Sequence, residues 1–110
     1  MREIEIPVAI AEIYDKLSIL EIKREKIKDK LKLENISKEY FLLIDILIKN
    51  NLEKNIKEFD ELLETNRKLW DAEDLAREKQ KEKQYDEKFI EYARQDFYFN
   101  DLRFLIKKRI

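Results

Sequence analysis

The chain contains no glycine, no cysteine and no histidine, and it has one proline in 110 residues. Without glycine, phosphate-cradling loops of the Rossmann and Walker types are excluded. Without cysteine there is neither a disulfide framework nor thiol chemistry, which fits a reducing compartment. Without histidine there is no imidazole base and no histidine-ligated metal. Any catalysis must therefore come from carboxylates, lysine, arginine or tyrosine, or from a hard cation held by carboxylates.

An excess of one charge sign is also missing, because 24 basic and 25 acidic residues give a formal net charge of −1. That balance gives no overall attraction to nucleic acid. The longest apolar run, YFLLIDILI, is interrupted by Asp45 and is far shorter than the roughly 20 residues of a membrane span. The start, MREIEIPVAI, carries acids among its apolar residues, unlike a signal peptide. We expect a cytoplasmic protein without nucleic-acid or membrane partners, and neither a cofactor nor a bound metal.

What the chain does have is charge and periodic hydrophobicity. Charged residues make up 45% of the sequence and hydrophobic residues 44%, a combination typical of long amphipathic helices. The residues that turns and sheets need are nearly absent. We predict a single all-α domain over residues 1–110, a helical bundle or long helical hairpin of two long and two or three shorter helices with an extended N-terminal arm.

The first half of the chain gives two helices. Residues 2–7 alternate charge and isoleucine before Pro7, which predicts the extended arm. A stripe of isoleucine and leucine then predicts a helix over residues 8–33, with Arg24 on its buried seam. A second helix is expected from Ser37, as N-cap, to residue 49.

The end of this second helix carries its own signal, since Asn50 and Asn51 favour a left-handed turn. A β-strand over residues 40–48 is the alternative, because short apolar runs are ambiguous. A third helix should run from about residue 52 into the low-complexity segment REKQKEKQ, residues 77–84.

Two caps are expected near the C-terminus. Asp86 can cap a fourth helix, and Asn100 can cap a short final helix whose C-terminus carries the cations of residues 107–109.

Polar residues share a helix face with the only tryptophan, Trp70. The spacing places Asn66, Glu73 and Arg77 along one line, with Asp74 beside them. If the first and third helices run parallel with similar starts, Arg24 reaches the same level. One hypothesis is a polar pocket for an anionic ligand, with Glu73 as acid or base. The other is an internal salt-bridge network that fixes the register of the helices.

Lysines flank the first apolar stripe. Lys16 and Lys23 lie one heptad apart and could hold an anion together with Arg24. Alternatively, their stems cover the core while their charged ends stay in water.

Two enzyme alternatives use the same part of the chain. Arg24, Lys23, Arg77 and Glu73 have the chemistry with which helical chorismate mutases grip a dicarboxylate. Carboxylates three residues apart also occur in all-helical nucleotide pyrophosphohydrolases that hold magnesium; here the pairs are Glu58 and Glu61, Glu61 and Glu64, and Asp71 and Asp74. With 25 acidic residues, several such pairs are expected by chance.

The C-terminal segment is rich in aromatic residues. Six of them lie between residues 89 and 104, more than one face of a short helix can bury. The surplus indicates an interface, and symmetric homodimers are the commonest assembly. We therefore expect a homodimer.

Three blocks carry a resemblance: IPVAIAEIYDKLSILEIK from residue 6, NRKLWDAEDLARE from residue 66 and FIEYARQDFYFNDLRFLIK from residue 89. Together they resemble a small all-helical family of bacterial and phage proteins catalogued as a domain of unknown function. The resemblance implies no mechanism, although some members lie near genes for surface polysaccharide or sugar transfer. Its polar motif residues correspond here to Lys16, Lys23, Asn66, Glu73, Asp74, Arg77, Arg94, Asn100, Asp101 and Arg103.

The first block departs from the family pattern. Ala9 and Ala11 stand where serine and glycine are usual, so the first helix lacks a capping side chain and should start weakly. The leading hypothesis from the sequence is a binding or assembly module accessory to carbohydrate or surface-polysaccharide metabolism. The rival is the small-molecule site around Trp70.

Overall fold

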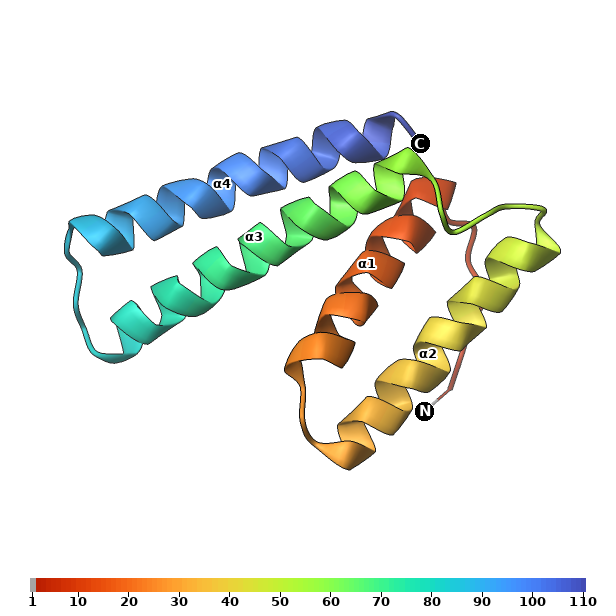
Figure 1. Ribbon diagram of the computed structural model, residues 1–110, viewed down its shortest axis with the longest axis horizontal. Coiled ribbons are helices and arrows are strands. Elements are labelled where there is room, and N and C mark those ends of the chain that lie inside the picture. Colours follow the sequence, from red (N-terminus) through yellow and green to blue (C-terminus); the bar gives the residue numbers. More distant parts are fainter. Residues whose placement is uncertain (1) are drawn as a thin grey trace.

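The computed structural model describes residues 2–110 and is all-α (Figure 1). Four helices follow one another along the chain: α1 Ile10–Lys26, α2 Lys30–Lys49, α3 Lys57–Lys81 and α4 Glu87–Lys108. The all-α prediction is confirmed, and residues 2–110 contain no strand. The β-strand alternative for residues 40–48 is wrong, because that segment lies inside α2.

The helices form two hairpins that meet along α1 and α3 (Figure 1). In the first hairpin α2 packs on α1, and in the second α4 packs on α3; α2 contacts no other helix of the described chain. The radius of gyration, 15.9 Å, exceeds the roughly 13 Å expected for a compact chain of this length. The outer faces of α2 and α4 therefore remain uncovered.

The hydrophobic core lies where the two hairpins meet. Tyr14 of α1 packs against Phe59 of α3, with ring centroids 6.5 Å apart. The hydroxyl of Tyr14 donates a hydrogen bond to the carbonyl of Glu53, so its polar end is satisfied within the core. The other buried members of this cluster are Leu17, Leu20, Tyr40, Leu47, Leu62 and Ile106.

The first helix ends earlier than the apolar stripe predicted. At Ile27 the backbone is extended, and α1 stops at Lys26 rather than near residue 33. Asp29 then caps α2 by accepting a hydrogen bond from the backbone N–H of Lys32 (3.0 Å). The predicted N-cap, Ser37, lies inside α2, so this part of the prediction is wrong.

Two local predictions are confirmed. Asn51 has a φ of 58°, and the backbone N–H of Leu52 donates to the carbonyl of Leu47 (2.9 Å), which closes α2 in a left-handed turn. Asp86 caps α4 by accepting from the backbone N–H of Phe89 (3.0 Å). Asn100, by contrast, lies within α4, where its amide donates to the carbonyl of Asp96 (3.1 Å). The two predicted C-terminal helices are thus one.

The segments before α1 and α3 are not helical. Residues 2–9 precede α1 as an arm with exposed side chains, as predicted, and Ala9 offers α1 no side-chain cap. The third helix begins at Lys57 and not near residue 52, because Ile56 is extended. Among residues 2–110, no helix is both long enough and apolar enough to span a bilayer.

Candidate functional site

The most deeply buried charge belongs to Asp15 of α1, which is 3% exposed. Its carboxylate accepts a hydrogen bond from the amide of Asn66 on α3 (3.0 Å) and one from Nε of Arg103 on α4 (2.9 Å). The Arg103 guanidinium also donates to the second carboxylate oxygen, so the pair is bidentate. One carboxylate therefore joins three of the four helices.

Ser18 completes the group, one turn further along α1. Its hydroxyl donates to the carbonyl of Asp15 (2.6 Å) and accepts from the amide of Asn66 (2.7 Å). We call Asp15, Ser18, Asn66 and Arg103 the buried polar cluster. The Asp15, Ser18 and Asn66 side chains are all fully buried, and each has a hydrogen-bond partner within the cluster. Hydrogen bonding in low dielectric makes such a cluster rigid.

The electrostatics of the cluster favour its charged form. Burial alone would raise the pKa of Asp15, but hydrogen bonds from Arg103 and Asn66 and the positive charges of Arg103 and Lys107 lower it below its usual value. Lys107 lies 3.6 Å from the Asp15 carboxylate and 2.7 Å from Glu12. The pKa of Arg103 is raised in turn, chiefly by its hydrogen bond to Asp15. The ion pair is therefore fully formed at neutral pH.

Glu73 separates two small hollows beside this cluster. The first, about 160 Å³, is lined by Ile19, Ile22, Asn66, Leu69, Trp70, Glu73 and Arg103. The second, about 250 Å³, lies between α3 and α4 and is lined by Glu73, Ala76, Arg77, Gln80, Phe89, Ala93, Asp96 and Phe97. Three of the polar residues predicted around Trp70, namely Asn66, Glu73 and Arg77, thus do border hollows.

The carboxyl group of Glu73 faces that of Asp96 on α4. Burial raises the pKa of Glu73, and a hydrogen bond to Asp96 and its negative charge raise it further; the charges of Arg77 and Arg103 act in the opposite direction. A neighbouring carboxylate disfavours the charged form of a glutamate. The fold therefore favours the protonated form of Glu73 more than water does.

Of the polar residues predicted around Trp70, Asp74 lines neither hollow and Arg77 borders the second one as an exposed side chain. The side chain of Arg77 is 73% exposed and lies 3.7 Å from both Glu73 and Asp74. Exposed pairs of this length contribute little to stability. The polar face of α3 is thus structural at Asn66 and open to water at Arg77.

Arg24 is the clearest correction. Its guanidinium lies over the rings of Tyr40 and Phe41, 4.7 and 5.5 Å from their centroids, and so faces α2 instead of Trp70. The position of Arg24 along the axis of α1, next to the middle of α3, was predicted correctly, because its neighbour Glu25 pairs with Arg67 of α3. The direction was wrong because the aromatic residues of α2 attract the cation.

The two lysines that flank the first apolar stripe differ in exposure. Lys16 is exposed and makes an ion pair with Glu39 of α2 (2.7 Å). Lys23, one heptad further along α1, is half-buried.

The motif residues of α4 divide between two faces. Arg103 points into the buried polar cluster and Asn100 bonds Asp96, whereas Arg94 and Asp101 are exposed on the outer face. The acidic pairs considered for magnesium are occupied otherwise: Glu61 pairs with Arg109, and Asp71 with Lys26. Within residues 2–110, no three acidic side chains are placed to hold a metal ion.

The sequence analysis missed Asp15 and Ser18. They lie three residues apart on α1, with Ile22 four residues further, which is the spacing of a second buried helix face. That face was overlooked because the stronger stripe through Leu17 dominates the segment. The spacing of Asp15, Ser18 and Ile22 therefore does indicate this buried face, but it is a weak indication unless the position of α4 is known.

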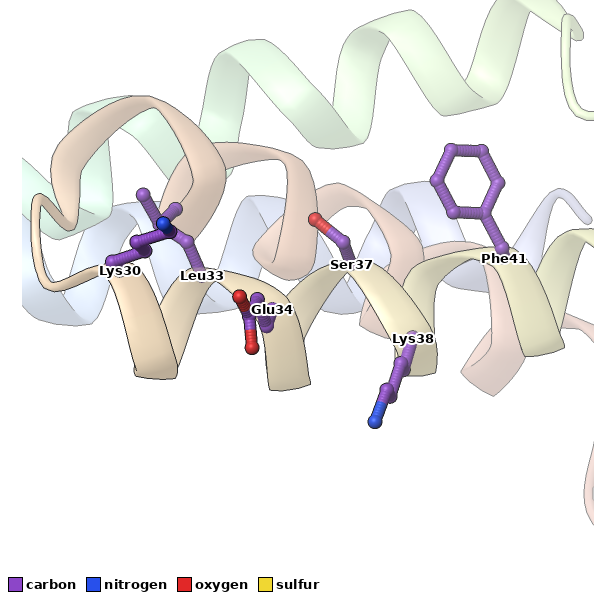
Figure 2. Close-up of a pocket in the computed structure, with 6 residues that line it drawn as sticks. All are labelled: Lys30, Leu33, Glu34, Ser37, Lys38 and Phe41. Carbon is purple, nitrogen blue, oxygen red and sulfur yellow. The ribbon is translucent and has the colours of Figure 1, made fainter.

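Another hollow, about 560 Å³, lies on α2 (Figure 2). Its lining comes from one helix only: Lys30, Leu33, Glu34, Ser37, Lys38 and Phe41. In Figure 2, Phe41 and Ser37 project to one side of the helix and Lys38 to the other, so no polar groups converge. This surface groove lacks the few convergent polar groups that fix a small ligand.

Residues 3–110 match the model of a family of unknown function, DUF6165. Because the match covers nearly the whole chain, the protein belongs to this family. Neither the curated proteins nor the solved structures contain a match to the chain.

Proposed function

We propose that the protein is a non-enzymatic binding and assembly module that acts as a homodimer. The observation that supports this proposal is the buried polar cluster. Asn66 and Arg103, which a ligand site would leave unpaired and open, are instead paired with Asp15. A ligand that used them would have to break a buried ion pair, which costs about 3–5 kcal/mol.

A second observation concerns hydrophobic surface. Among residues 2–110, fifteen large apolar residues are exposed, and on the helices they concentrate on α2 and α4: Leu31, Phe41, Leu42 and Ile48, and Ile90, Phe97, Tyr98, Phe104 and Leu105. Exposed apolar patches on small proteins mark interaction sites. A chain with an uncovered face on each of its two hairpins has the form of a scaffold element.

The setting that we propose is the cytoplasm, which suits a chain without cysteine. An accessory role in carbohydrate or surface-polysaccharide metabolism is proposed only from the family resemblance. Deleting the gene in a producing cell should then alter surface polysaccharide without loss of a glycosyl-transfer activity from the extract. An unchanged polysaccharide in that strain would contradict this part of the proposal.

Light scattering on the purified protein tests the assembly. We expect twice the chain mass of 13.6 kDa at concentrations of about 10–200 μM. Arg77→Ala, which removes an exposed charge, should leave this mass unchanged and serves as the control. A native mass of 13.6 kDa over the whole range would contradict the homodimer.

A small-molecule site is the second candidate, favoured by the raised pKa of Glu73 between two hollows. Its ligand would be small and anionic, held near Arg103 and Arg77, with the protonated Glu73 as hydrogen-bond donor. A thermal-shift screen of small carboxylates and phosphates against the native protein and Glu73→Leu, which has no hydrogen-bond donor, tests it. Stabilisation of the native protein alone supports the site, and no stabilisation by any anion argues against it.

A further inference from the structure

We propose that the outer face of α4 pairs with the same face of a second copy, with the two helices antiparallel. This inference rests on the proposed function, because it specifies which surface forms the homodimer. Along one edge of the molecule α4 has only α3 and the start of α1 beside it (Figure 1). A helix of 22 residues presents an outer face about 33 Å long.

An apolar row runs along this face at heptad spacing. Ile90, Phe97 and Phe104 are seven residues apart and are 51%, 71% and 57% exposed. Residues seven apart on a helix drift by only about 20°, so the three side chains form a nearly straight row. Tyr98 and Leu105 form a second exposed apolar row on the same face, about 80–100° away.

A row of charges lies between these two apolar rows. It consists of Glu87, Arg94, Asp101 and Lys108, again seven residues apart and all exposed. None of the four is among the ion-paired side chains of residues 2–110, although Arg103 and Lys107 of α4 are paired with α1. The signs alternate along the row: negative, positive, negative, positive.

This order of signs is complementary to itself in one orientation only. In an antiparallel pair centred between Phe97 and Tyr98, Arg94 faces Asp101 of the second copy. In the same arrangement Glu87 faces Lys108. Two-fold symmetry repeats each contact, so the row forms four ion pairs. In a parallel pair with no offset, each charge faces its own copy and the row repels itself.

The apolar rows obey the same symmetry. A two-fold axis perpendicular to both helices brings each side of one helix face against the same side of the other. The row through Phe97 therefore meets its own copy, and so does the row through Tyr98. Apolar contact would supply the attraction and the charges would select the orientation, which is how complementary charges act at interfaces.

Charge reversal and re-pairing test this arrangement. Arg94→Asp and Asp101→Arg each place like charges opposite one another twice, so each should raise the dimer dissociation constant at least about tenfold. The mixture of the two variants should form a heterodimer, because every contact is again between opposite charges. The double variant should dimerise like the native protein. Sedimentation velocity measures dimerisation of the two single variants, of their mixture and of the double variant.

Matched controls lie on α2. Lys38→Glu and Glu34→Arg make the same charge changes on the outside of that helix and should leave dimerisation unchanged. Circular dichroism verifies that each variant is folded. If the native protein dimerises but the α4 reversals have no effect, or the mixture fails to re-pair, this inference is overturned while the homodimer stands. If the native protein is a monomer, both the proposed homodimer and the pairing of α4 are contradicted.

The absence of cysteine permits a second measurement of orientation. Phe97→Cys carries the only thiol of the chain and lies near the two-fold axis, so mild oxidation should give a covalent dimer. Ile90→Cys lies seven residues from Phe97, which is about 10 Å along the helix, and should remain uncrosslinked. Crosslinking of both variants would indicate a parallel pair and overturn the antiparallel arrangement.

Discussion

Asp15 on α1 and Arg103 on α4 form a buried, bidentate ion pair although they are 88 residues apart in the sequence. The first and last helices are thereby joined directly, at a place where they share few other contacts. Asn66 of α3 bonds the same carboxylate (3.0 Å), so the position of α4 on α3 is coupled to α1. This polar group therefore acts together with the hydrophobic core in fixing how the two hairpins meet.

The first prediction concerns this ion pair. Arg103→Met removes the bidentate partner of the buried Asp15 carboxylate and leaves only Lys107, 3.6 Å away, as a cation, so it should lower the free energy of unfolding by about 3–5 kcal/mol. The double variant Asp15→Leu with Arg103→Met removes both charges and should recover much of that loss. Urea unfolding of the single and double variants measures the coupling. Equal stability of Arg103→Met and the native protein would contradict the structural role.

The second prediction concerns pH. The pKa of Asp15 is lowered in the folded protein, so its contribution to stability is fully present above the unfolded value of about 3.9 and is lost as pH falls through the folded pKa. Between pH 5 and pH 2 the native protein should therefore lose more stability than Asp15→Asn does. Urea midpoints at several pH values test this, and parallel curves for the two proteins would contradict it.

The third prediction concerns Glu73, whose contribution to stability changes with pH in the opposite direction to that of Asp15. The pKa of Glu73 is raised beside Asp96, so folding favours its protonated form, and this contribution is present at low pH and lost as pH rises through the folded pKa. Glu73→Gln mimics the protonated form and should be more stable than the native protein at pH 7, with the difference vanishing near pH 4. Thermal melts at both pH values measure it. Asp74→Asn, on the same helix but without a facing carboxylate, is the control.

Some features of this fold follow from a few neighbouring residues and were predictable. The left-handed turn at Asn51 and the cap at Asp86 are of this kind, because turn and cap preferences act within about four residues. The all-α class followed from composition and periodicity. The break at Ile27 was missed because the apolar spacing continues across it to Leu31, and only the Asp29 cap marks the new helix.

The candidate site was less predictable, because its geometry depends on which helix covers which face. Asn66 and Arg103 were both identified, but their common partner Asp15 was not, since its burial requires α4 to lie across α1. Arg24 was placed at the correct level and in the wrong direction, because the choice between Trp70 and Tyr40 depends on how α2 turns back. Long-range packing of this kind leaves only a weak local pattern in the sequence.

The last prediction concerns the start of α1. Ala9 is its N-cap and has no side chain that can accept a hydrogen bond from the first turn, although its backbone is already extended (ψ 145°), as a capping residue requires. Ala9→Ser should therefore add a cap without rearrangement and raise the free energy of unfolding by about 0.5–2 kcal/mol. Urea unfolding measures this gain.

The matched control is Ala11→Ser, which places the same hydroxyl inside the first turn, where it caps nothing and should be neutral or slightly destabilising. A gain for Ala9→Ser alone would show that α1 starts where the structure places it. Because Asp15 lies only one to two turns from that start, the cap should also increase the hydrogen-exchange protection of the α1 segment that holds the buried polar cluster. Equal gains from both serines would argue that α1 begins elsewhere.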